Sequence, residues 1–133
     1  MKFLVIQGSK HVSVVADVRQ SSYPIKGENS RSDLQRRVGK ILREKFKLQI
    51  ILEDWTVPTT RMSLDFLVLP NRIAVEVQGE QHFEHIPFFH KTKIDFAGQI
   101  NRDNAKKVFC ELNGITFVTV TKEDFKEVLE NDI

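Results

Sequence analysis

The chain has little cysteine, no long apolar run and almost no net charge, and each shortage excludes a class of protein. One cysteine among 133 residues cannot form an internal disulfide, and no CxxC pair is present to hold zinc. No apolar stretch approaches the ~20 residues of a membrane-spanning helix, so no membrane partner is expected. A formal net charge of +2 excludes a polycation. What remains is an ordinary globular protein, with Cys110 expected as a buried thiol.

Length and the first residues predict one intracellular domain. At 133 residues a single domain is expected, made of an N-terminal β-hairpin (1–19) and a core (30–133). The apolar run at 1–7 ends too early for a secretion signal, and no small-residue cleavage site follows it. We therefore expect a strand there and a cytoplasmic protein, either bacterial or of a phage-infected host cell.

The periodicity of apolar residues predicts the element order ββ–α–β–β–β–α–β–α, which is a mixed sheet with helices on its faces. Apolar residues at 34, 38, 41 and 42 form one helical stripe, which begins after the N-cap residue Ser32. The other expected elements are strands at 2–6, 11–18, 48–53, 63–69, 72–78 and 115–120, and helices at about 95–112 and at 122–130, the last one capped by Thr121.

The expected hairpin at 63–78 carries the most information about function. A turn centred after Pro70 places Asp65 opposite Glu76, with Gln78 on the same side. Carboxylates that face each other across two strands repel, and burial adds to the cost unless a cation neutralises them. Magnesium is usually held by one or two carboxylates with water and phosphate, so the pair predicts an Mg²⁺ (or Mn²⁺) site. Ion pairing with an arginine is the open alternative, with Arg61 and Arg72 as candidates.

Charge is unevenly distributed along the chain. Residues 31–47 carry seven basic side chains and two acidic ones, and the tail from residue 111 is acidic. A basic face of this kind suits a phosphate backbone, but a solvated helix surface is the simpler explanation of charge alone.

A family resemblance adds to these observations. It is carried by LDFLVLP at 64–70 and IAVEVQGEQHF at 73–83, and it continues through FFH at 88–90, RDNAK at 102–106 and CELNGI at 110–115. LQRRVGKIL at 34–42 extends it backwards. These segments resemble the core of the PD-(D/E)XK nuclease superfamily, in particular its small stand-alone endonuclease-like proteins of phages and bacteria. More distantly they are similar to very-short-patch repair endonucleases.

The resemblance implies a restriction-endonuclease-like α/β fold, with the N-terminal hairpin as an addition. It also implies an Mg²⁺-dependent deoxyribonuclease that nicks DNA or cleaves particular DNA structures. Asp65 and Glu76 would be the metal ligands, Gln78 would place water or phosphate, and His82 with Lys106 or Arg102 would manage protons and charge. The expected nucleic-acid-binding side chains are Gln35, Arg36, Arg37, Lys40, Arg102 and Lys106.

Departures from the family pattern keep other functions open. Gln78 stands where the family has lysine, and Gln35 stands where many relatives have a glutamate. The alternatives are a catalytically inactive nucleic-acid-binding protein and a phage-type module that binds another protein through its hairpin. An exposed hairpin edge would also permit a homodimer. Histidines at 82, 85 and 90 permit zinc, but without the fixed spacing that makes zinc motifs specific.

Overall fold

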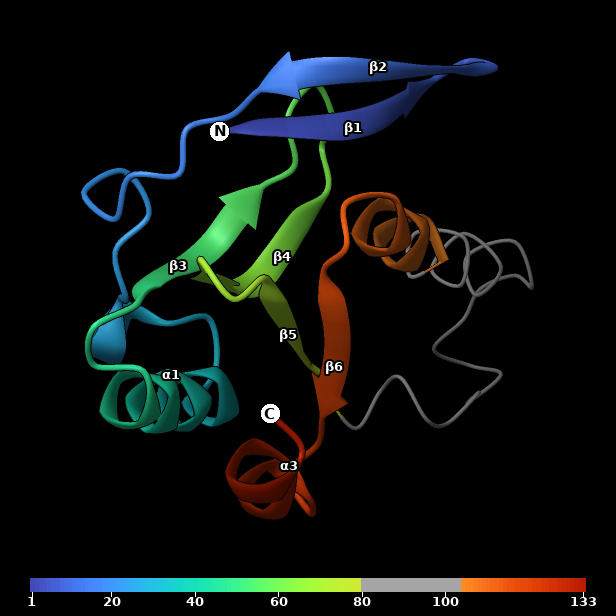
Figure 1. The fold of residues 1–133 in the computed structure, drawn as a ribbon. Coiled ribbons are helices and arrows are strands. Elements are labelled where there is room, and N and C mark those ends of the chain that lie inside the picture. Colours follow the sequence, from blue (N-terminus) through green and yellow to red (C-terminus); the bar gives the residue numbers. More distant parts are fainter. Residues whose placement is uncertain (80–103) are drawn as a thin grey trace, which may run out of the picture.

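The computed structural model describes residues 1–79 and 104–133. Within these ranges the chain forms a two-stranded hairpin and a four-stranded sheet, flanked by helices (Figure 1). The elements are β1 (Lys2–Gln7), β2 (Lys10–Val15), the 3-10 helix η1 (Gly27–Asn29), α1 (Asp33–Lys45), β3 (Ile50–Thr56), β4 (Ser63–Leu69), β5 (Ile73–Val77), helical residues 104–112, β6 (Thr116–Val120) and α3 (Phe125–Asn131).

The larger sheet is mixed, as expected. Its strand order is β3-β4-β5-β6, in which β3, β4 and β5 are antiparallel neighbours and β5 pairs with β6 in parallel. Parallel neighbours need a long connection between them, and here the chain returns to the sheet through helical residues 104–112. The predicted α/β class and the order of the strands are therefore confirmed.

Both faces of the sheet are buried. On one face α1 and α3 contribute Leu42 and Leu129 to an apolar cluster. The hairpin and helical residues 104–112 lie apart from α1 and α3 and cover the other face (Figure 1). They pack Phe3 and Phe109 against Trp55, with ring centroids 5.2 to 6.0 Å apart. The expected covering of both faces of the mixed sheet is thus observed, and the N-terminal hairpin contributes to one of the two apolar layers. The acidic residues therefore lie at the end of a strand pair that is covered on both sides.

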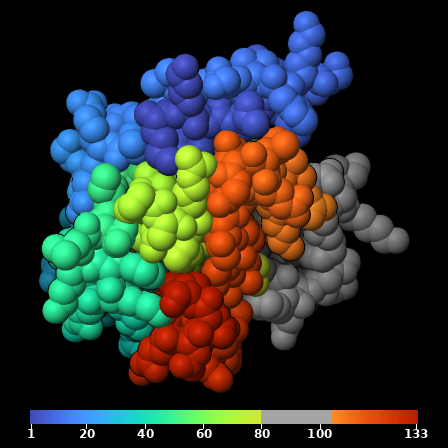
Figure 2. Space-filling model, in the orientation of Figure 1, coloured from blue at the N-terminus to red at the C-terminus, as the bar shows by residue number. Residues whose placement is uncertain are grey.

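The N-terminal hairpin is present as predicted, with its turn at Gly8, which has a φ of +63°. Asn113 attaches the hairpin to the core, because its side-chain amide pairs with the backbone of β1 as a neighbouring strand would. Its Oδ1 accepts from the Leu4 N–H at 2.7 Å, and its Nδ2 donates to the Leu4 and Phe109 carbonyls at 2.9 and 2.8 Å. In the space-filling view the hairpin forms a ridge at one end of the molecule, and α3 lies at the other end (Figure 2).

Most strand boundaries differ from the expected ones, by a single residue at β1 (Lys2–Gln7) and β6 (Thr116–Val120) and with a visible cause at three other strands. The strand expected at 48–53 is Ile50–Thr56, because Leu48 is 99% exposed whereas Trp55 pairs with Leu64 and is buried. The second strand of the hairpin ends at Val15 rather than at residue 18. The strand expected at 72–78 is Ile73–Val77, since Arg72 has a φ of +56° and belongs to the turn.

The helix ends are partly as predicted. Ser32 is the N-cap of α1, and its side chain accepts from the Gln35 N–H at 3.0 Å. The last helix begins at Phe125 with Asp124 as its N-cap, not after Thr121 as expected. Thr121 instead forms a turn with Asp124, in which each backbone N–H donates to the other's side chain. Of the helix expected at 95–112, the part before residue 104 lies outside the described residues. No helix in the described part of the chain is long and apolar enough to cross a membrane.

Candidate metal centre

Three carboxylates lie in one row across the sheet. The register of β3, β4 and β5 places Asp54, Asp65 and Glu76 opposite one another on neighbouring strands. The observed pair Leu67–Ala74 has the register expected from the turn after residue 70, so the placement of Asp65 opposite Glu76 was predicted correctly. The row continues to β6, where Thr119 is the partner of Glu76.

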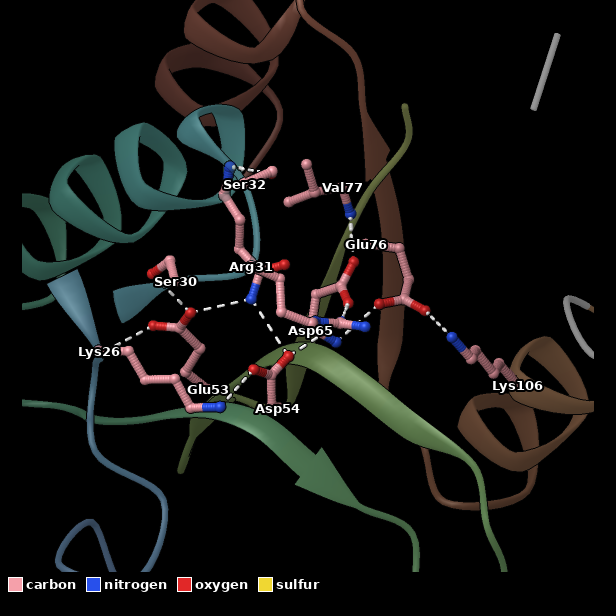
Figure 3. Close-up of polar contacts among 11 residues, drawn as sticks. Lys26, Ser30, Arg31, Ser32, Glu53, Asp54, Asp65, Glu76, Val77 and Lys106 are labelled. Atoms are coloured by element: carbon pink, nitrogen blue, oxygen red, sulfur yellow. Dashed lines mark hydrogen bonds and ion pairs between the residues drawn. The ribbon is translucent and has the colours of Figure 1, made fainter. Parts of the chain in front are cut away.

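Asp65 and Glu76 are bound to each other's strands through backbone N–H groups. The Asp65 N–H donates to Glu76 Oε2, and the Val77 N–H donates to Asp65 Oδ2, both at 2.7 Å (Figure 3). Both acids are only 7% exposed. At this point the two strands are thus joined by side-chain-to-backbone hydrogen bonds instead of backbone-to-backbone ones. The second oxygen of each carboxylate, Asp65 Oδ1 and Glu76 Oε1, is left to contact cations.

The alternation of side chains is interrupted at the two aspartates. Asp54 has a φ of +51°, a left-handed conformation that aspartate tolerates better than most residues. Leu52 and Trp55, three positions apart, lie in the same apolar cluster, and so do Leu64 and Leu67. Strict alternation would put residues three apart on opposite faces. The sheet is therefore irregular where the acids meet, and unusual backbone of this kind is concentrated at functional sites.

Three basic side chains from distant segments contact the acids. Lys26 Nζ lies 2.7 Å from Asp54 Oδ2. Lys106 Nζ, on the helical residues 104–112, lies 2.6 Å from Glu76 Oε1. Arg31 Nη2 binds Asp65 Oδ1 and lies 2.9 Å from Asp54 Oδ1 (Figure 3). Lys106, which the sequence analysis expected to manage charge in the site, therefore contacts one of its acids.

The arginines proposed from the sequence as partners of the acids are not the ones found. Arg72 donates to the Asn113 carbonyl at 2.7 Å and so helps to hold the end of the helical segment. The ion pairs of Asp65 in the described part of the chain involve Arg31, which precedes the N-cap of α1.

A buried glutamate beside the row holds the loop that carries Arg31. Glu53 is 1% exposed and accepts from the Lys26 N–H at 2.8 Å, from Ser30 Oγ at 2.7 Å and from Gln35 Nε2 at 2.9 Å. Gln35 Nε2 also lies 3.1 Å from Asp54 Oδ1. Gln35, which was expected to bind nucleic acid, is buried and reaches the edge of the site through Asp54.

Charge repulsion remains in the row despite these contacts. Burial and the neighbouring charge of Asp65 raise the pKa of Glu76 to about 7, and Lys106 only partly opposes this shift. Burial also opposes ionisation of Asp54, but hydrogen bonds from Lys26 and Gln35 and the charge of Arg31 outweigh it, so the pKa of Asp54 is lowered. A cation beside Glu76 would thus be bound with a gain in free energy.

The raised pKa of Glu76 predicts a pH dependence of stability. Because the folded state binds this proton more tightly than the unfolded chain, the stabilisation is complete below pH 4.5 and is lost as the pH rises through about 7. In unfolding experiments without metal, the wild-type protein should gain on the order of 2 kcal/mol relative to Glu76→Gln between pH 8 and pH 5. Parallel pH profiles of the two proteins would contradict this assignment.

The remaining predicted residues are placed as follows. Gln78 follows β5 and is half-buried, and its N–H donates to the Val120 carbonyl at 2.9 Å. Arg36 and Arg37 pair with Asp33 at the exposed start of α1, and Lys40 on the same helix is exposed. The residues expected in the site or as zinc ligands that lie outside the described residues are His82, His85, His90 and Arg102.

Cys110 is fully buried, as predicted. Burial, together with the nearby charge of Glu76, raises the pKa of this thiol to about 12. It therefore stays protonated and belongs to the core rather than to the chemistry of the site.

The donor set fits a hard divalent cation, with two protein ligands rather than three. Asp65 and Glu76 offer carboxylate oxygens, which Mg²⁺ and Mn²⁺ prefer, and each of these oxygens keeps a further lone pair beside its hydrogen bond. Among residues 1–79 and 104–133, no three Asp, Glu, His or Cys side chains converge on one metal position. The remaining ligands would then be water and substrate phosphate, which is usual for Mg²⁺.

Sequence reasoning missed Asp54, Glu53 and Arg31. For Asp54 a signal was available, because centring the β3–β4 connection between Thr59 and Thr60 places Asp54 opposite Asp65. For Glu53 and Arg31 no local signal exists, since their partners lie 18 to 34 residues away in the chain.

Comparisons with known proteins give relatives but no described function. No protein-family model matches the chain, and no solved structure matches it significantly. It is similar to the uncharacterized protein 307L of Invertebrate iridescent virus 6, with 38% identity over 64 residues, 47% of this chain and 32% of the relative. It is also similar to the uncharacterized protein 094L of Frog virus 3, with 31% identity over 96 residues, 71% of this chain and 61% of the relative. The chain thus spans less than two thirds of either viral relative.

Proposed function

We propose that the protein is a metal-dependent endonuclease of the PD-(D/E)XK type with a restriction-endonuclease-like fold, and that it hydrolyses phosphodiester bonds in DNA. The observation that carries the proposal is the buried pair Asp65–Glu76, in which each acid accepts an N–H of the other's strand while burial, together with repulsion by Asp65, keeps the pKa of Glu76 raised. An arrangement that only stabilised the fold would not need two buried like charges side by side. The sequence resemblance supports the same conclusion.

Lys106 supplies a positive charge that Gln78 lacks. The family has lysine where this chain has Gln78, but here the ammonium group that contacts Glu76 comes from the helical segment 104–112. An ammonium group within a few ångströms of the bound phosphate can donate a hydrogen bond to it and offset the charge that develops during hydrolysis. The neutral Gln78 is therefore compatible with an active site.

Each described residue would have a distinct role. Asp65 and Glu76 would hold Mg²⁺ or Mn²⁺, and the bound ion would polarise the phosphate and lower the pKa of a coordinated water. Lys106 would hold a phosphate oxygen, and the half-buried Gln78 amide would orient water or phosphate. The basic residues Arg36, Arg37 and Lys40 on α1 would contact the nucleic-acid backbone outside the site.

The test is nicking or cleavage of supercoiled plasmid DNA by the purified protein. We expect cleavage with Mg²⁺ or Mn²⁺, none with a chelator, and none by Asp65→Asn, which keeps the size of the side chain and removes its charge. DNA binding that weakens with salt but brings no cleavage under any of these conditions would instead indicate the inactive binding protein. Equal cleavage by wild type and Asp65→Asn would remove Asp65 from the site.

A further inference from the structure

We propose that Arg31 is a phosphate ligand of this site, and that it occupies the place of a cation on Asp54 and Asp65 until a divalent ion binds. The inference rests on the proposed nuclease function. It adds a residue that would link binding of the ion to binding of the substrate.

The first observation is how the guanidinium group meets the acids. A single nitrogen, Nη2, contacts Asp65 Oδ1 and lies 2.9 Å from Asp54 Oδ1, so one positively charged group bridges carboxylates of two neighbouring strands. Arginine pairs most favourably with one carboxylate through two parallel hydrogen bonds. Here the two acids leave the Nε–H and Nη1–H groups unused (Figure 3). Arg31 therefore bridges the two carboxylates as a metal cation would, and its Nε–H and Nη1–H groups can donate to a further ligand.

The second observation is that the residues on both sides of Arg31 are held by hydrogen bonds, whereas its side chain is largely exposed to solvent. Ser30 Oγ donates to the buried Glu53, and Ser32 caps α1, so the residues on both sides are held. The Arg31 side chain is 58% exposed, whereas those of its two acidic partners are 14% and 10% exposed. The guanidinium group thus reaches the acids from solvent and can leave them without rearrangement of the loop.

Electrostatics then gives the order of events. An ion coordinated by Asp65 repels a guanidinium group on the same carboxylate, because two positive charges a few ångströms apart interact strongly at a partly buried site. Arg31 must therefore give up Asp65 when the ion binds. Asp54 lies farther along the row and still attracts Arg31, which keeps the guanidinium group beside the site. A phosphate bound there would accept the two N–H groups that the acids do not use, in the bidentate geometry that arginine favours.

The experiment is a calorimetric titration with Mn²⁺ in the absence of nucleic acid. If Arg31 competes with the ion, Arg31→Gln should bind Mn²⁺ about tenfold more tightly than wild type, since one nearby positive charge is removed. The matched control is Arg19→Gln, because Arg19 also pairs with an aspartate, Asp17, but lies outside the site. It should bind Mn²⁺ as wild type does.

Cleavage of plasmid DNA at saturating Mn²⁺ tests the phosphate role. Arg31→Gln should cleave about a hundredfold more slowly, the loss typical of removing one donor to a developing charge. Arg31→Lys keeps the charge without the bidentate geometry and should show Mn²⁺ affinity close to wild type, with cleavage between the two. Because both variants are read by metal binding as well as by activity, a folding defect would be recognised as a loss of both.

The outcomes separate the two proposals. Wild-type Mn²⁺ binding that Arg31→Gln leaves unchanged would overturn the role of Arg31 as a competing cation while the nuclease proposal stands. Tighter Mn²⁺ binding with undiminished cleavage would overturn its role as a phosphate ligand. If neither wild type nor Arg31→Gln shows Mn²⁺ binding that depends on Asp65, the metal site itself is wrong, and the inference falls with it.

Discussion

Glu76→Gln is expected to slow Mg²⁺- or Mn²⁺-dependent DNA cleavage about a thousandfold or more, equivalent to about 4 kcal/mol of transition-state stabilisation. It should also abolish the rise in unfolding temperature that the ions give the wild-type protein. The glutamine carbonyl can still accept from the Asp65 N–H, as Glu76 Oε2 does at 2.7 Å, so the strand pairing is kept. What is lost is one of the two charges that would hold the ion.

The metal-free variant distinguishes this effect from misfolding. Because Glu76 is a buried charge with a raised pKa, its neutral replacement should be at least as stable as wild type at pH 8 without metal. Glu111→Gln is the matched control, since Glu111 is an exposed acid on the same helical segment as Lys106. A Glu76→Gln protein that is stable and cuts DNA at the wild-type rate would exclude Glu76 as a metal ligand.

Glu53→Ala is expected to lower the free energy of unfolding by about 3 to 5 kcal/mol, the largest stability loss that we anticipate for a polar side chain. Glu53 accepts from the Lys26 N–H, Ser30 Oγ and Gln35 Nε2 at 2.7 to 2.9 Å. Without the carboxylate these donors are left in a buried position beside a new cavity. Urea denaturation monitored by tryptophan fluorescence measures the loss, because Trp55 on the same strand is fully buried.

Glu44→Ala provides the comparison for Glu53. Glu44 is exposed on α1, so its loss should change the stability by no more than about 0.5 kcal/mol. Since the Glu53 contacts also position Arg31, any folded Glu53 variant should bind Mn²⁺ with altered affinity. A stability loss for Glu53→Ala below about 1 kcal/mol would mean that other contacts hold the loop between β2 and α1.

Local patterns in the sequence were sufficient for most of the elements and for the central pair of acids. Turn residues set the register of the 63–78 hairpin, so the opposition of Asp65 and Glu76 follows from the chain alone. The apolar stripe and Ser32 likewise located α1. These features depend on residues near one another in the chain, for which periodicity and capping rules hold.

The ends of helices and strands were harder to predict from the sequence. Thr121 and Asp124 are both good capping residues, and α3 begins after Asp124, at Phe125, which packs with Leu129 into the core beside the sheet. The start of β3 depended in the same way on partners in β4 rather than on the apolar character of Leu48. Competing local signals are resolved by tertiary contacts, which the sequence pattern does not contain.

By itself, the sequence determined the α/β class, the strand order along the chain and the buried acid pair. The tertiary structure alone decided that Asp54 joins the row and that Lys26, Arg31 and Lys106 neutralise it. The physical reason is twofold. Alternation along a strand is a local rule that one residue with positive φ, here Asp54, can reset. A buried carboxylate pairs with the basic side chain that the fold places beside it. Here those side chains come from segments tens of residues away in the chain, so local patterns do not identify them.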